Sequence, residues 1–171
     1  MRDYILCIFI FAMCGCTNKY HDGFLCRYLY FQTSTNKNAF WVEVKENRSM
    51  KVTFGDITWA CYKTIKHGRF PDKGIEWDRI KDKDSITVDS LTYKQLENLA
   101  SEVRKRKSVN TFIVTIDYDA MGTVLFIKDK YYYVVMGDYK DKTTQNFIKK
   151  LRETSPIPIR ASVGSVLQNY D

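Results

Sequence analysis

The chain has 171 residues, 44% of them hydrophobic and 15% aromatic, so it can bury one ordinary core without a dense set of disulfides or a structural metal. Its three prolines and eight glycines exclude a collagen-like or low-complexity chain. The formal net charge of +7 favours acidic partners, and by itself it leaves open nucleic acid, phospholipid head groups, cell-wall polymers and acidic proteins.

The first fifteen residues have the layout of a secretory signal peptide. Arg2 precedes an apolar run over residues 5–13, and the run closes on Cys14, Gly15 and Cys16. The run is too short to cross a bilayer as a helix, which takes about 20 apolar residues. Residues 1–15 are therefore predicted to direct export.

The end of this segment, Met13-Cys14-Gly15-Cys16, resembles the lipobox of bacterial lipoproteins, although Leu is commoner than Met13 and a smaller residue is usual at Cys14. The resemblance implies a lipid anchor on Cys16 and a flexible tether over residues 16–23. It also implies a location in the bacterial cell envelope, facing the periplasm or the cell surface. The alternatives are an ordinary secretory signal and an N-terminal helix that is never removed.

Residues 24–171 are predicted to form one globular α+β domain. Segment 24–31 is apolar and aromatic almost throughout, which favours a strand, although pattern alone does not exclude a short helix. Residues 40–45 and 50–54 alternate on either side of a short polar turn, which indicates a β-hairpin. A further strand is predicted over residues 57–65.

Residues 66–85 show no periodicity and are predicted to form a long loop. Loops of this length in compact domains are commonly functional, so this one is the first candidate for a working surface. Aromatic and Arg side chains supply most binding hot spots. The predicted contact residues are therefore Arg69, Phe70, Trp77 and Arg79. Alternatively, Trp77 anchors the loop to the core.

The same loop contains the candidate for acid–base chemistry, His67. Imidazole titrates near neutrality, and a neighbouring carboxylate can orient it. Asp72, Glu76 and Asp78 are the carboxylates that follow in the loop, although their spacing is not diagnostic. An envelope hydrolase or transferase is thus the second functional hypothesis, and a solvated loop of mixed charge is its structural alternative.

The clearest local signal is a capping box in which Thr92 precedes Gln95, which predicts a helix over about 93–107. The helix carries one apolar face and ends in four basic residues, 104–107, where cations suit the negative end of the dipole. This basic cluster is therefore interpreted as a helix end, and no nucleic-acid partner is expected of an exported protein.

The C-terminal part is predicted to begin with an antiparallel meander. Residues 111–118, 123–128 and 131–136 are rich in β-branched and aromatic side chains, and short turns join them. Asp141 can then cap a second helix that ends before Pro156. The apolar side of this helix would consist of Phe147, Ile148 and Leu151.

This order of elements predicts an α+β fold with an antiparallel sheet of about five to seven strands and two main helices packed on one face. A doubly wound parallel sheet is the weaker alternative. The tail over residues 156–171 carries no clear pattern.

The cysteines divide according to the predicted export. Cys7 and Cys14 would leave with the signal and Cys16 would carry lipid, so Cys26 and Cys61 remain in the domain. Two thiols in an oxidising compartment form a natural pair, and a Cys26–Cys61 disulfide is predicted. The alternative is two buried free thiols that act as small apolar side chains.

No catalytic or metal-binding motif stands out in the sequence. It lacks GxxxxGK, GxSxG, HExxH and paired CxxC motifs, and it has only two histidines, so no cofactor or metal is expected. The sequence therefore favours an envelope-anchored lipoprotein that is a non-catalytic protein-binding module. Its partner is expected to be a protein, and the basic charge favours an acidic one. Immunity or inhibitor-type proteins fit this profile by analogy, and so do accessory subunits of envelope assemblies.

Overall fold

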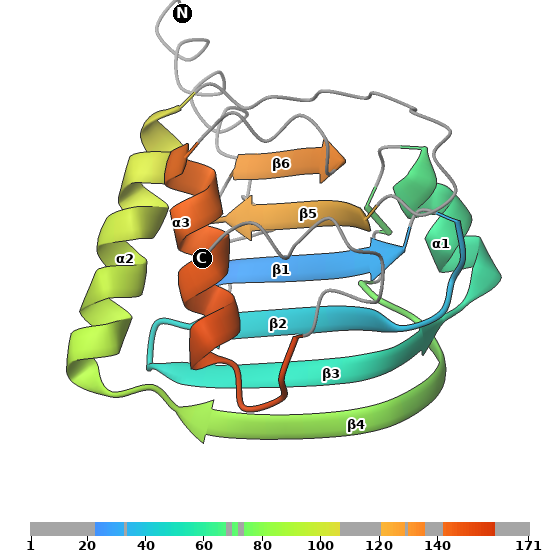
Figure 1. The fold of residues 1–171 in the computed structure, drawn as a ribbon, viewed down its shortest axis with the longest axis horizontal. Helices are drawn as coiled ribbons and strands as arrows, with labels where there is room; N and C mark the ends of the chain where they lie inside the picture. The colour runs from blue at the N-terminus through green and yellow to red at the C-terminus, as the bar shows by residue number, and fades with distance from the viewer. Residues whose placement is uncertain are drawn as a thin grey trace, which may run out of the picture.

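The computed structural model describes residues 23–32, 34–67, 70–71, 74–106, 121–128, 130–135 and 142–159. These ranges contain six strands and three helices, arranged as one sheet with helices on both of its faces (Figure 1). The predicted α+β class is therefore confirmed.

The sheet is antiparallel throughout, and its strand order is β4-β3-β2-β1-β5-β6. The strands are β1 (Phe24–Gln32), β2 (Ala39–Lys45), β3 (Ser49–Ile57), β4 (Trp77–Thr87), β5 (Met121–Ile127) and β6 (Lys130–Val135). The predicted hairpin is confirmed as β2 and β3, and two strands of the predicted meander are β5 and β6. The parallel alternative is wrong.

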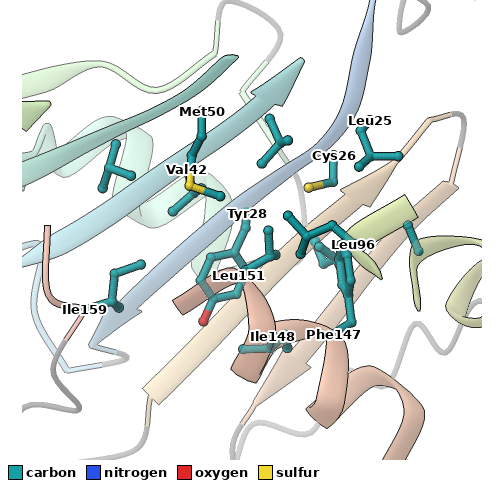
Figure 2. Close-up of a cluster of buried hydrophobic side chains, with 14 of the residues drawn as sticks. Leu25, Cys26, Tyr28, Val42, Met50, Leu96, Phe147, Ile148, Leu151 and Ile159 are labelled. Atoms are coloured by element: carbon teal, nitrogen blue, oxygen red, sulfur yellow. The ribbon is translucent and has the colours of Figure 1, made fainter. Parts of the chain in front are cut away.

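Two helices cover one face of the sheet. They are α2 (Ser90–Lys105) and α3 (Lys142–Thr154), which lie side by side in Figure 1. Their apolar sides close a first core over Tyr28 and Tyr30 of β1 and Val42 of β2. Figure 2 shows Tyr28 and Val42 facing Leu151 of α3. The two helices predicted for one face are therefore α2 and α3.

A third helix, α1 (Trp59–Lys66), covers part of the opposite face at one end of the sheet (Figure 1). The alternation of β1 turns Leu29 and Phe31 toward this side, where they form a second core with buried residues of α1. The strand predicted over residues 57–65 is wrong, because β3 ends at Ile57 and the chain then turns into α1. The apolar residues after the turn have helical rather than alternating spacing.

The long loop predicted over residues 66–85 is also wrong in its second half, where Trp77–Thr87 forms the edge strand β4. No residue of β4 is fully buried, so the strand lacks the apolar alternation that predicts strands. Its edge is charged, and Asp82 and Asp84 accept hydrogen bonds from the backbone N–H of Lys83 (2.8 Å) and Ser85 (2.7 Å). Such charges are typical of sheet edges.

The helix predicted over about 93–107 is confirmed as α2, but its N-cap is different. Asp89 Oδ1 accepts from the N–H groups of Leu91 (3.0 Å) and Thr92 (2.9 Å), so the helix begins one turn earlier than a Thr92 cap would place it. The second predicted helix is confirmed as α3. The strand predicted over 111–118 and the cap at Asp141 lie outside the described residues.

Gly55 permits a close approach between β3 and β4. A Cβ at this position would clash with the carbonyl oxygen of Arg79, where the register of the two strands shifts. We expect Gly55→Ala to lower the free energy of unfolding by about 1–3 kcal/mol in urea denaturation, because the added methyl must push β4 away. Ser85→Ala, at an exposed position of β4, should change it by less than about 0.5 kcal/mol. Equal stability of the two variants would contradict this approach.

Candidate contact surface on the first helix

The helix α1 is fixed at its start by a cap and along one side by the second core. Thr58 Oγ1 accepts a hydrogen bond from the backbone N–H of Cys61 at 3.2 Å, which satisfies one of the free donors at the helix start. Cys61, Tyr62 and Ile65 are buried against the sheet. The opposite side of the helix is therefore held in a defined orientation toward solvent.

That solvent side carries an ordered row of aromatic and basic side chains. Trp59 is 52% exposed, yet its indole stacks on the buried ring of Tyr62 with centroids 4.9 Å apart. The Nζ atoms of Lys63 and Lys66 lie 5.7 Å from the ring centroids of Trp59 and Tyr62, respectively. We call the exposed residues Trp59, Lys63 and Lys66, together with the buried Tyr62 whose ring supports them, the α1 ladder. Its contacts join residues three or four positions apart, which are neighbours on a helix.

The ladder is cationic. The helix α1 contains no acidic residue, and Lys63 and Lys66 are both exposed. None of the ion pairs that join residues of the described ranges involves Lys63 or Lys66. The α1 ladder therefore combines an exposed indole, held in place by stacking, with two ammonium groups that have no carboxylate partner in the described part of the chain.

A buried carboxylate stabilises the end of the sheet from which α1 leaves. Asp56 accepts from Lys81 Nζ at 2.6 Å and from the Asn38 N–H at 3.1 Å, and Lys37 Nζ lies 3.7 Å away. Burial raises the pKa of Asp56, but the hydrogen bonds and the positive charges of Lys81 and Lys37 outweigh it and hold the pKa below its ordinary value of 3.8. The carboxylate is therefore ionised at neutral pH and joins the loop at 34–38 to β3 and β4.

The backbone around the start of α1 is also hydrogen-bonded from both sides. Ile57 donates to the Asn36 carbonyl at 2.9 Å, and Asn36 Nδ2 donates back to the Ile57 carbonyl at 2.7 Å. Thr58 donates to the Glu76 carbonyl at 2.9 Å. Two segments distant in sequence thus hold the turn between β3 and α1, and these hydrogen bonds fix the position of the ladder on the domain.

The predicted acid–base residues are not assembled into a site within the described ranges. His67 is exposed at the end of α1, where its backbone N–H donates to the Lys63 carbonyl at 3.1 Å. No ion pair there joins its ring to Glu76 or Asp78, which are both exposed. Asp72 lies outside the described residues. The geometry of these residues therefore gives the hydrolase or transferase hypothesis no support.

Two of the predicted contact residues face the protein instead. Phe70 stacks on Trp41 with centroids 5.5 Å apart and meets Phe126 edge-on at 4.6 Å. Trp77 pairs with Ile57 in the sheet and packs against the second core, as its alternative role as an anchor required. Arg79 is exposed on β4, and Arg69 lies outside the described residues. The aromatic members of the predicted patch thus contribute to packing.

The predicted disulfide between Cys26 and Cys61 is wrong in this structure, because both cysteines are free. Cys26 belongs to the first core and Cys61 to the second, so the sheet separates the two thiols. Burial raises the pKa of each thiol, which keeps both protonated at neutral pH. They act as small apolar side chains, and the predicted lipidation site, Cys16, lies outside the described residues.

The sequence does not predict the ladder, because the pattern of residues 57–65 favours a strand. Two sequence signals point to it in retrospect. Trp59 and Lys63 are four residues apart, as are Tyr62 and Lys66, and Thr58 is a good N-cap residue. Read with a helical period, the same stretch separates into a buried side and an exposed basic side.

The described residues contain neither a cluster of metal ligands nor a membrane-spanning helix. Within these ranges no group of three or more His, Cys, Asp or Glu residues could hold a metal ion. No helix in the same ranges is long and apolar enough to cross a membrane. The sequence matches no protein-family model and no curated protein.

The Asp56 network makes stability depend on pH in a defined direction. Because the folded pKa is lowered, its stabilisation is complete above the ordinary pKa near 4 and is lost as the pH falls through the folded value. At pH 7, Asp56→Asn should lower the free energy of unfolding by about 1–3 kcal/mol, and this deficit should shrink below about pH 4.

Chemical denaturation across the pH range measures this difference. Asp84→Asn is the matched control, since Asp84 is exposed on β4 and an amide oxygen can still accept the Ser85 N–H. A pH-independent deficit for Asp56→Asn would rule out the stabilising charge of Asp56.

Proposed function

We propose that the chain is an envelope-anchored, non-catalytic protein-binding module whose contact surface is the α1 ladder. The observation that carries this proposal is Trp59, a large aromatic side chain that is half exposed and yet ordered by stacking on Tyr62. Trp is enriched among binding hot spots, and a side chain that is already ordered loses little conformational entropy when a partner covers it.

The place of α1 in the fold supports this function. The described chain starts at Gly23, and β1 then runs for nine residues, about 30 Å, toward the end of the sheet that carries α1 (Figure 1). A lipid on Cys16 would therefore hold the opposite end of the sheet close to the membrane. The ladder would face away from the bilayer, where a protein partner can reach it.

A rigid domain that presents one ordered surface at a membrane suits an immunity or inhibitor-type protein, which neutralises a toxin or hydrolase. The two cores and the bonded turn before α1 give the ladder this rigidity. The more specific assignment rests on analogy, and an accessory subunit of an envelope assembly would use the same surface.

The anchor has its own test. Cys16→Ser should abolish incorporation of labelled fatty acid and release the protein from membranes, because the thiol of Cys16 is the proposed acceptor. Cys7→Ser, within the predicted signal, is the matched control and should be labelled normally. Undiminished labelling of the Cys16→Ser protein would exclude the anchor.

The contact surface is tested by capture from envelope extracts with the full-length protein. Trp59→Ala should weaken binding of the captured partner by roughly thirtyfold or more, because the substitution removes the indole but none of the buried side of α1. Leu91→Ala is the control, since Leu91 is also a large exposed apolar residue but lies in α2. Both variants should stay folded, with Trp59→Ala melting only a few degrees lower because it loses the stack on Tyr62. Equal capture by all three proteins would refute the proposed surface.

A further inference from the structure

We infer that the α1 ladder binds an acidic segment of the partner protein, whose carboxylates pair with Lys63 and Lys66 while an apolar part covers Trp59. This inference rests on the proposed function and adds the chemical class of the partner. Its basis is the combination of an exposed indole and two cations without a carboxylate partner in the described chain.

The two lysines form one cationic site. They are three residues apart on the same helix, and each Nζ lies 5.7 Å from the centroid of one of the two stacked rings, Trp59 or Tyr62. Like charges at this spacing disfavour the helix slightly when no acid lies between them. Each ammonium carries three donors, and contact with an aromatic face leaves donors free for carboxylate oxygens. A partner with two or more acidic residues would relieve the repulsion and satisfy these donors.

The helix dipole explains only part of this arrangement. Lys63 and Lys66 lie in the last turn of α1, where cations are favourable in any helix. The dipole gives no reason for a half-exposed indole beneath the ammonium of Lys63. A carboxylate can pair with the ammonium of Lys63 while an apolar group of the same segment covers the indole beside it. The two features together therefore favour an acidic protein segment.

Other occupants fit the surface less well. Anionic lipid would suit Trp and Lys, but Trp59 is the only large apolar side chain that α1 exposes. The helix also lies at the end of the sheet opposite to the start of β1 (Figure 1). A second copy of the chain would bring a net charge of +7 against another of +7. Both occupants become outcomes of the test.

The test uses the full-length protein, labelled with 15N in neutral detergent micelles, and two synthetic peptides. One peptide has six glutamates around a central leucine, and the other has glutamines in their place. The glutamate peptide should shift the indole N–H signal of Trp59 and the amide signals of Lys63 and Lys66. The shifts should fade in 1 M salt, where the screening length falls to about 3 Å.

Charge reversal locates the effect. The double variant with Lys63→Glu and Lys66→Glu should bind the glutamate peptide about tenfold more weakly, because both attractions become repulsions. Lys94→Glu is the control, since Lys94 is exposed in α2, and it should alter binding less than twofold. Equal shifts with the glutamine peptide, shifts centred elsewhere, or self-association through α1 would overturn the inference. Stronger shifts on adding lysophosphatidylglycerol to the micelles would overturn it in favour of lipid.

The capture assay separates this inference from the proposed function. If Trp59→Ala abolishes capture and the double lysine variant captures normally, the partner surface is not acidic and the proposed function stands. If the glutamate peptide binds at the ladder but the Trp59→Ala variant captures the partner as well as the wild type, the proposed function is wrong. Loss of capture in both variants, with retention in Lys94→Glu, supports the acidic partner.

Discussion

The burial of β1 on both of its faces is the constraint on which the rest of the fold depends. This strand is hydrogen-bonded to β2 on one side and to β5 on the other, and its side chains alternate between the two cores. Tyr28 and Tyr30 lie under α2 and α3, while Leu29 and Phe31 lie on the side of α1. A shift of one residue in register would exchange the two sets. The position of α1, and with it the α1 ladder, is therefore fixed through β1.

The parts of the fold that the sequence predicts well are those in which local pattern and burial agree. The β2–β3 hairpin, α2 and the apolar side of α3 formed by Phe147, Ile148 and Leu151 are all confirmed, although α2 begins at Asp89 rather than at Thr92. The elements that were predicted wrongly have weak local patterns. β4 is an edge strand without a buried face, and α1 is too short for its aromatic residues to indicate a helix rather than a strand.

The candidate site was likewise predicted only in part, because local pattern does not show which side chains face solvent. Aromatic and basic residues of the loop that follows α1 are predicted to make contacts, but in the structure some of these side chains face the core and others face solvent. Of the predicted contact residues, Phe70 and Trp77 pack against the second core, whereas the exposed indole is that of Trp59, which was not among them. Composition predicts which side chains favour binding, but only the fold determines which of them face outward. The fold also explains why Cys26 and Cys61 form no disulfide, since the two thiols lie on opposite faces of the sheet.

The hydrogen bonds along β4 have a consequence for assembly. The N–H groups of Lys83 and Ser85 bond the preceding aspartates, so they are not available to a strand from another molecule. This edge of the sheet is thereby protected against extension by strand addition. The protection matters most where copies are crowded on a surface, as the proposed anchor would crowd them. There it would leave recognition to side chains and keep neighbouring copies from joining into a continuous sheet.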